Sequence, residues 1–174
     1  MDLPHRKPQR LKGYDYSQNN AYFITICTQN RLHLLGGIVN ETVELSDAGK
    51  MAEERFLNIA KDTEVNIEKY VFMPNHIHAI VLIDHNGTTQ GSFPTVSEMV
   101  QRFKTITTKL YIDGVKSGVY PPFEKKIWQK SFYDHIIRNE KSYLDVWQYI
   151  DENPLKWQED ELSAELDNLR DNIM

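Results

Sequence analysis

The chain of 174 residues has the length of one domain and is long enough to bury a sizeable core. Its hydrophobic content of 40% and charged content of 26% are typical of a globular protein, and no run of 18 apolar residues predicts a membrane-spanning helix. The first residues lack the apolar stretch of a signal peptide, and the single cysteine, Cys27, excludes an intrachain disulfide. We therefore expect a cytoplasmic protein without a membrane partner.

The formal net charge of −5 is unevenly distributed along the chain. The segment 158–174 has six acidic residues and one arginine, so the remainder of the chain is neutral overall. Within that remainder, basic residues gather in three groups: Arg6, Lys7, Arg10 and Lys12; then Arg102, Lys104 and Lys109; and then Lys125, Lys126 and Lys130. Such local groups can bind a polyanion, so the acidic total does not exclude nucleic acid as a partner.

The first half of the chain predicts an arm, three strands and a helix. Residues 1–18 contain two prolines and a glycine, which favours an extended arm. Aromatic and β-branched residues over 21–28 predict a strand. Gly36-Gly37 predicts the turn of a hairpin between strands at 32–35 and 38–45. Ser46 is expected to cap a helix that ends near Lys61.

The second half predicts an alternation of strands and helices. The expected elements, in chain order, are strands at 65–73 and 76–83, a helix from Thr95 or Ser97 through Leu110, a loop at 114–122, a short strand at 127–132, a helix at 140–153 and an acidic helix at 157–169. This order predicts an α+β fold in which an antiparallel sheet has helices packed on one face. The other face of the sheet would be free for a ligand.

Two histidines, His76 and His78, lie two residues apart in an apolar, β-branched segment. The side chains of a strand alternate between its two faces, so both imidazoles are expected on the same face of the sheet. Two imidazoles placed in this way can bind one divalent ion. An isolated pair is also compatible with a purely structural role, and a metal site therefore needs a third ligand.

The helix predicted at 140–153 offers that ligand. Its core-facing stripe consists of Tyr143, Val146, Trp147 and Ile150. A separate stripe, roughly 120° around the helix, consists of Asp145, Tyr149 and Asn153. Tyr149 thus lies outside the core stripe, and Asn153 can supply an amide oxygen. Pro154 predicts that Asn153 lies at the end of the helix or at a kink.

Five segments between residues 11 and 156 carry a resemblance to a known family. They are residues 11–17 (LKGYDYS), 22–28 (YFITICT), 73–78 (MPNHIH), 128–135 (WQKSFYDH) and 149–156 (YIDENPLK). Through them the chain resembles the REP-associated tyrosine transposases, within the IS200-like group of single-tyrosine HUH transposases, where HUH denotes His-hydrophobic-His. It differs at residues 153–158, which read NPLKWQ where the family usually has NPVKHG.

The resemblance implies a ferredoxin-like or RRM-like antiparallel sheet, with the histidines on its central strand and the nucleophilic tyrosine on a C-terminal helix. It implies that His76, His78 and Asn153 bind Mg²⁺ or Mn²⁺ and that Tyr149 is the nucleophile. The implied activity is cleavage and rejoining of single-stranded, hairpin-bearing DNA, such as a repetitive extragenic palindrome, through a 5′-phosphotyrosine. Residues 1–18, 19–157 and 158–174 would be a basic arm, the catalytic domain and an acidic helix or tail, in a monomer or homodimer.

DNA contacts are expected outside the metal site as well. The expected phosphate contacts are Arg6, Lys7, Arg10 and Lys12 of the arm, together with Arg102 and Lys104. Unpaired bases are expected to stack on Trp128, Phe132 or Tyr133. Two other functions stay open: a non-catalytic DNA-binding domain, in which DNA never becomes covalently attached, and a hydrolase that uses a metal-bound water and turns over without Tyr149.

Overall fold

The computed structural model describes residues 20–63, 65–83 and 95–157, to which the following account refers. Within these ranges, the main sheet is antiparallel and has the strand order β4-β5-β1-β6. Its strands are β1 (Asn20–Cys27), β4 (Val65–Met73), β5 (His76–Ile83) and β6 (Tyr133–Ile137). A smaller sheet pairs β2 (Gly36–Val39) with β3 (Thr42–Leu45). The predicted α+β class with an antiparallel sheet is confirmed.

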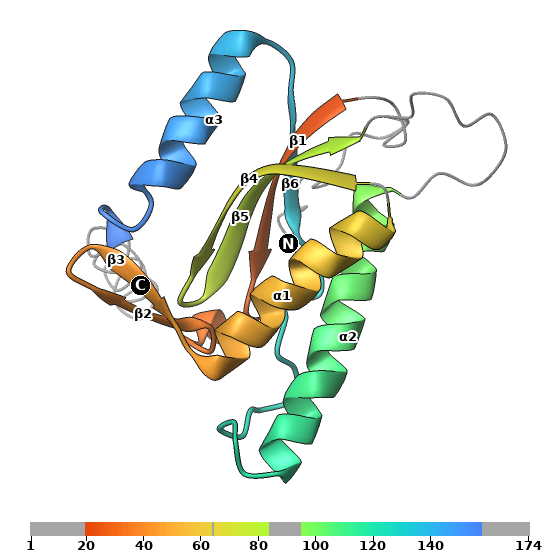
Figure 1. Cartoon of the computed structure of the whole chain (residues 1–174), viewed down its shortest axis with the longest axis vertical. Coiled ribbons are helices and arrows are strands. Elements are labelled where there is room, and N and C mark those ends of the chain that lie inside the picture. Colours follow the sequence, from red (N-terminus) through yellow and green to blue (C-terminus); the bar gives the residue numbers. More distant parts are fainter. Residues whose placement is uncertain (1–19, 64, 84–94, 158–174) are drawn as a thin grey trace, which may run out of the picture.

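Three helices pack against the two faces of the main sheet. Helices α1 (Asp47–Asp62) and α2 (Val96–Lys116) cover one face, and α3 (Glu140–Glu152) crosses the other (Figure 1). A short 3₁₀ helix, η1 (Gln29–Arg31), follows β1. None of the helices in the described ranges is long and apolar enough to span a membrane. The fold therefore has a two-helix layer, a sheet, and one helix on the opposite side.

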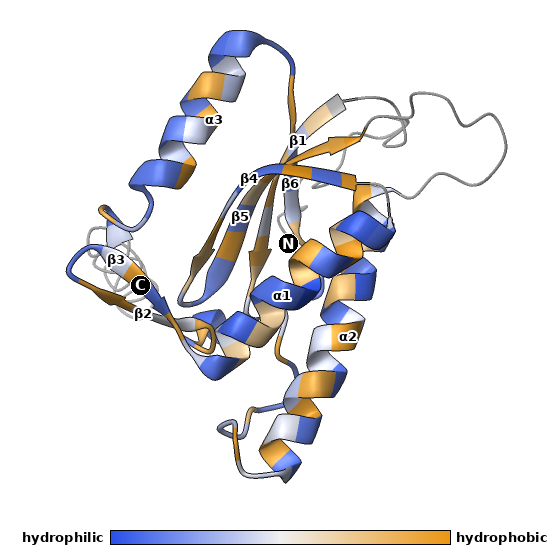
Figure 2. Cartoon of the chain, viewed as in Figure 1, coloured by the Kyte–Doolittle hydropathy of each residue, from blue (hydrophilic) through white to orange (hydrophobic). Residues whose placement is uncertain are grey.

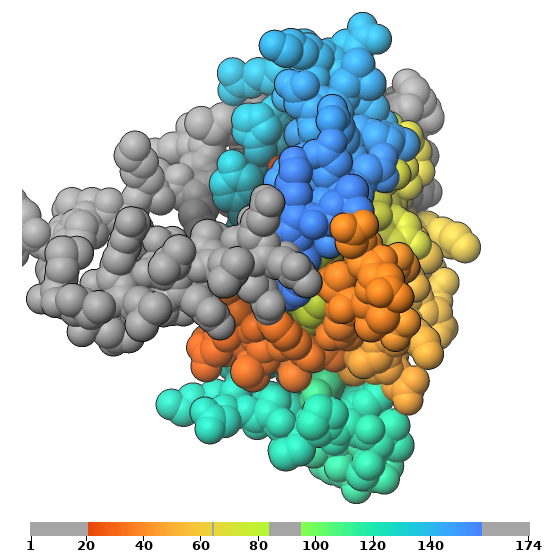
Figure 3. All heavy atoms as spheres, turned by 90° about the vertical axis from the view of Figure 1, so that its left-hand side faces the viewer, coloured from red at the N-terminus to blue at the C-terminus, as the bar shows by residue number. Residues whose placement is uncertain are grey.

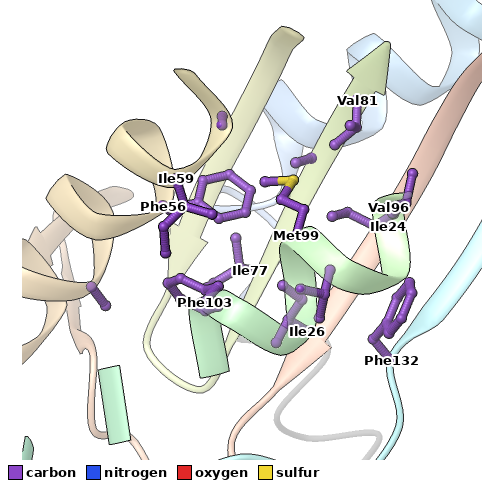
Figure 4. Packing of buried hydrophobic residues seen from close by; sticks show 14 of the residues in the cluster. Ile24, Ile26, Phe56, Ile59, Ile77, Val81, Val96, Met99, Phe103 and Phe132 are labelled. Atoms are coloured by element: carbon purple, nitrogen blue, oxygen red, sulfur yellow. The ribbon is translucent and has the colours of Figure 1, made fainter. Parts of the chain in front are cut away.

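The main core lies between the sheet and the layer of α1 and α2. Residues of β5 alternate, so that Ile77 and Val81 point into this core while His76 and His78 point to the other face. Phe56 of α1 and Phe103 of α2 meet over the sheet, with ring centroids 5.4 Å apart (Figure 4). In the strands and the helices alike, apolar stretches alternate with polar ones (Figure 2). One face of the sheet thus carries the main core, and the other carries the two histidines and the smaller cluster around Ile150 of α3.

The capping residues of α1 and α2 agree with the sequence. Ser46 Oγ accepts a hydrogen bond from the Gly49 amide, and Thr95 forms a reciprocal capping box with Glu98. Helix α2 continues beyond the predicted end and passes through Gly114. A Cβ at Gly114 would overlap the ring of Tyr120. This glycine therefore makes room for a neighbouring side chain and does not end the helix.

The hairpin β2–β3 turns at a different place from the one predicted. The turn lies at Asn40-Glu41, whose φ angles of 49° and 60° are both in the left-handed region. Gly36 lies inside β2, where a Cβ would overlap the carbonyl oxygen of Glu44. Glycine is needed there for the close approach of the two strands, and the predicted turn at Gly36-Gly37 is wrong.

The strand predicted at 127–132 is also misplaced, because β6 begins at Tyr133. Residues 127–129 run beside the end of β1, where the Gln29 amide donates to Ile127 O and the Gln129 amide donates to Cys27 O. The apolar residues that suggested a strand fill the core from this loop: Ile127, Trp128 and Phe132 are all buried. The predicted arm at 1–18 and most of the predicted helix at 157–169 lie outside the described residues.

Candidate active site

The two histidines of β5 form the centre of the candidate site. Strand β5 is hydrogen-bonded on both sides, with His76 opposite Met73 of β4 and Cys27 of β1. The rings of His76 and His78 face the side of the sheet that α3 crosses, with their centroids 4.5 Å apart. The expectation that both imidazoles share one face is confirmed.

Each imidazole has one partner on its Nδ1 side and another on its Nε2 side. His76 Nδ1 lies 2.7 Å from Asn75 Oδ1, and His78 Nδ1 lies 2.8 Å from Thr25 Oγ1. The two Nε2 atoms face residues of the C-terminal helix: His76 Nε2 is 3.3 Å from Asn153 Oδ1, and His78 Nε2 is 3.4 Å from the hydroxyl of Tyr149. Strand β1 and the turn between β4 and β5 thus supply the partners on the Nδ1 side, and the C-terminal end of α3 supplies those on the Nε2 side.

Helix α3 places Tyr149 and Asn153 through its opposite, apolar stripe. Ile150 is buried in a second hydrophobic cluster with Ile80 and Ile137, and the other predicted stripe residues pack against it. Lys69 of β4 forms an ion pair with Asp151, which attaches the helix to the sheet edge. Asn153 caps the helix and is 2% exposed, whereas Tyr149 is 43% exposed. Tyr149 is therefore open to a large substrate.

Burial controls the charge of both histidines. Removal from water lowers the pKa of His76 to about 4, and the positive charge of Arg31 contributes in the same direction. Burial also lowers the pKa of His78 well below its usual value, and the neighbouring His76 adds to this effect. Both imidazoles are therefore neutral near pH 7, the form in which histidine binds a metal ion.

The donors present fit a divalent cation. Two imidazole nitrogens and one amide oxygen point toward one region, and metal-binding histidines usually have their other ring nitrogen hydrogen-bonded, as both do here. Among the described residues, no group of three His, Cys, Asp or Glu side chains could hold a metal ion. A metal at His76 and His78 would thus take its third protein ligand from the Asn153 amide.

The residues expected to contact DNA fall into three sets. Arg6, Lys7, Arg10 and Lys12 lie outside the described residues. Arg102 and Lys104 belong to α2, on the sheet face opposite the histidines. There Arg102 pairs with Asp62 at 3.4 Å, and Lys104 Nζ donates to the backbone carbonyls of residues 129 and 131. Their role as DNA contacts stays a prediction.

The expectation that Trp128 stacks on an unpaired base is corrected by its burial. Its side chain is only 5% exposed, and its Nε1 donates a hydrogen bond to Thr107 Oγ1 at 2.9 Å. Phe132 is buried in the same core, whereas Tyr133 is 51% exposed and lies opposite Thr25 in the β1–β6 pairing. Of the three aromatic candidates, only Tyr133 thus presents a ring to solvent on the histidine face.

Several residues around the site were not singled out from the sequence. Phe23 stacks on His78 and meets Tyr149 edge-on, with centroid distances of 5.2 and 5.9 Å. Trp157 lies beside His76, and Figure 3 shows the end of the α3 region next to the β2–β3 hairpin. Asn75 directly precedes His76, so the sequence itself indicates that it lies near the site. The contact of Thr25 with His78 depends on the register of β1 and β5, which the sequence does not indicate.

Comparisons with known proteins agree on one family. The profile of the family described as "Transposase IS200 like" matches residues 16–153. An uncharacterized protein of Haemophilus influenzae is 35% identical over 169 residues, covering 92% of this chain and 94% of that protein. The REP-associated tyrosine transposase of Escherichia coli K12 is 25% identical over 141 residues, covering 81% and 70%. A solved REP-associated tyrosine transposase bound to a REP hairpin has a similar fold, with a TM-score of 0.59, 23% identity and coverage of 84% and 73%.

Proposed function

The chain belongs to the IS200-like transposase family, and from this we propose that it cleaves and rejoins single-stranded DNA through a covalent bond to Tyr149. Family membership makes it a DNA transposase, and the proposal adds the chemistry. The observation that carries it is the position of Tyr149, whose partly exposed hydroxyl lies 3.4 Å from His78 Nε2. A tyrosine that lies outside the core stripe of its helix and against the neutral His78 is suited to attack a bound phosphodiester.

Tyr149 would act as the nucleophile in a reversible exchange of ester bonds. Its phenolic oxygen forms a bond to the phosphorus of the scissile phosphate while the bond from phosphorus to the 3′ oxygen breaks. The phenol loses its proton, and the leaving oxygen gains one to become a 3′-hydroxyl. The product is a 5′-phosphotyrosine, which keeps one phosphodiester bond for every bond broken. Attack by another 3′-hydroxyl reverses the step and joins a new pair of DNA ends.

His76, His78 and Asn153 are proposed to hold a divalent ion, Mg²⁺ or Mn²⁺. Such an ion, when bound, would neutralise charge on the scissile phosphate. The neutral state of both histidines and their bonded Nδ1 atoms support this assignment. A mixed set of imidazole and amide donors favours Mn²⁺ over Mg²⁺.

Hairpin-bearing DNA is the proposed substrate. The E. coli relative is a REP-associated tyrosine transposase, and the solved structure with a similar fold holds a REP hairpin. The half-exposed Tyr149 leaves access for a DNA strand on the α3 side of the sheet. We propose that a hairpin of this type places an adjoining single strand across the histidine pair.

The proposal is tested with labelled single-stranded hairpin DNA, Mn²⁺ or Mg²⁺, and a denaturing gel. We expect a metal-dependent, SDS-stable adduct that is absent from Tyr149→Phe and from His76→Ala. Tyr133→Phe is the matched control, because Tyr133 is another exposed tyrosine on the same sheet face, and its adduct should be unchanged. Hairpin binding without an adduct would indicate a non-catalytic binder, and DNA cleavage that persists in Tyr149→Phe would indicate a hydrolase.

A further inference from the structure

The side-chain oxygen of Asn75 lies against one of the two ring nitrogens of His76. A neutral imidazole has one N–H and one lone pair, and only the nitrogen with the lone pair can bind a cation. His76 Nδ1 lies 2.7 Å from Asn75 Oδ1, while Nε2 faces the site. The usefulness of His76 as a ligand therefore depends on where that proton lies.

The neighbours of Asn75 settle the orientation of its amide group. Asn75 Nδ2 lies 3.3 Å from the backbone carbonyl oxygen of Arg31. A carbonyl oxygen only accepts, so the NH₂ group must face Arg31 and Oδ1 must face His76. Because Oδ1 also only accepts, His76 Nδ1 has to be the donor. The lone pair of His76 then lies on Nε2.

The backbone around Asn75 is held in place by buried contacts. The Asn75 carbonyl oxygen accepts hydrogen bonds from the amide and the hydroxyl of Thr28, at 2.9 and 3.0 Å. Asn30 and Arg31 have φ angles of 54° and 52°, a conformation that residues other than glycine adopt infrequently. These left-handed residues sit where the chain must place the Arg31 carbonyl against the Asn75 amide.

We infer that Asn75 is a positioning residue that keeps His76 in the Nδ1–H form and directs the Nε2 lone pair into the metal site. In this form, two acceptors, His76 Nε2 and Asn153 Oδ1, face each other at 3.3 Å, an arrangement that a cation between them would stabilise. Thr25 differs, because a hydroxyl can donate or accept and so does not fix the tautomer of His78. This inference rests on the proposed metal site and adds a residue outside its ligands.

The first test is ¹⁵N NMR of the metal-free protein, with long-range ¹H–¹⁵N correlations to locate each ring proton. The His76 signals are those missing from a His76→Gln spectrum. We expect Nδ1–H at His76 in the wild type and in Asn75→Asp, whose carboxylate still accepts. Asn75→Ala should shift His76 wholly or partly to the Nε2–H form.

The second test is the affinity for Mn²⁺ alone, measured by calorimetry. Loss of such an outer partner weakens metal binding about 10–100-fold, which is the effect we expect for Asn75→Ala. Asn75→Asp should bind within a few-fold of the wild type. Asn58→Ala is the matched control, since Asn58 is an exposed residue of α1 on the other side of the sheet, and it should bind Mn²⁺ normally.

An Nε2–H tautomer at His76 in the wild type would overturn the inference, and that result needs no variant to fold. Wild-type tautomer and Mn²⁺ affinity in Asn75→Ala would overturn it as well. The expected tautomers in a protein that binds no Mn²⁺ would support the role of Asn75 and refute the metal site. A normal DNA adduct together with an unchanged tautomer in Asn75→Ala would refute the role of Asn75 and leave the proposed function standing.

Discussion

The Nε2 atom of His78 faces two possible partners, a metal ion and the hydroxyl of Tyr149. Its Nε2 faces the hydroxyl of Tyr149 and is also the atom available to a metal, because Thr25 bonds the other nitrogen. One lone pair cannot bind a cation and accept the Tyr149 proton at the same time. In the proposed reaction, the phenol therefore has to give its proton to a group other than His78.

The depressed pKa of His76 makes the metal-free protein sensitive to acid. The folded-state pKa is about 4 because the ring is buried, and the unfolded value is near 6.5. Protons thus bind preferentially to the unfolded state. The contribution of neutral His76 to the free energy of unfolding is therefore fully present above about pH 6.5 and is lost as the pH approaches 4. We expect His76 to account for a loss on the order of 3 kcal/mol in the free energy of unfolding over this range.

Urea unfolding at a series of pH values checks this prediction. The loss attributed to His76 should be missing from His76→Gln, while His135→Gln, which changes an exposed histidine of β6, should follow the wild type. Equal pH dependence in the wild type and His76→Gln would refute the link to this residue.

Trp128 is expected to affect stability rather than DNA binding. Trp128→Phe removes the hydrogen bond to Thr107 and leaves space in the core, so the free energy of unfolding should fall by roughly 1–3 kcal/mol. Tyr133→Leu, at an exposed position, should change stability by less than about 0.5 kcal/mol and should weaken hairpin binding. Urea unfolding and a DNA-binding titration measure both effects. Weaker DNA binding by Trp128→Phe, without a loss of stability, would support the prediction that Trp128 stacks on a base.

At the scale of elements, the periodicity of apolar residues in the sequence predicted the bounds of several helices and strands and the face to which their side chains point. The bounds of β4, β5 and α1 agree with the sequence, since the two strands are rich in apolar and β-branched residues between turns and α1 has helical apolar spacing after its cap. The shared face of the histidines and the separation of Tyr149 from the core stripe follow from the same periodicities. The resemblance to IS200-like transposases is confirmed by the family match over residues 16–153.

What the sequence missed depends on contacts between distant segments. Thr25 meets His78 only because β1 and β5 pair in one particular register, and the Asn75 amide is oriented by a carbonyl 44 residues away. The apolar residues near 127–132 predicted a strand, but in the structure they lie in a loop whose side chains are buried in the core. A local pattern indicates that a residue is buried without saying which element buries it.

Gly49 of α1 links the small hairpin to the turn before His76. A Cβ at Gly49 would overlap the carbonyl oxygen of Leu35, and the Leu35 amide donates to Pro74 O at 3.0 Å. We expect Gly49→Ala to lose about 1–3 kcal/mol of stability, as overpacking does. Gly37→Ala is the control, because Gly37 has open space around it and should stay within about 1 kcal/mol of the wild type. Equal urea midpoints for the two variants would contradict this account.

At the scale of the whole molecule, the residues that form the large core and those of the candidate active site lie on opposite faces of the sheet. The large core lies under α1 and α2, whereas α3 is attached to the opposite face by a small cluster around Ile150 and by the ion pair of Lys69 with Asp151. A metal bound by the two histidines and Asn153 would connect α3 to β5. Metal binding is therefore expected to stabilise the fold as well as the site.

This coupling predicts a thermal shift. Mn²⁺ at about 100 times its dissociation constant should add about 2.7 kcal/mol, which corresponds to a rise in Tm of roughly 5–10 °C for a chain of this size. The rise should disappear with EDTA and in His78→Gln, and it should persist in His135→Gln. Scanning fluorimetry measures these Tm values. A similar rise in Tm for His78→Gln would mean that the metal binds elsewhere.

The central claim, that Tyr149 forms the covalent bond to DNA, is tested most directly by mass spectrometry of the adduct. Trypsin should release residues 142–156 as one peptide, because Lys141 and Lys156 bracket a stretch without Lys or Arg. This peptide contains both Tyr149 and the core-stripe residue Tyr143, so each spectrum has an internal comparison. We predict a nucleotide 5′-phosphate on Tyr149. A nucleotide on Tyr143, or on a tyrosine outside this peptide, would contradict the account.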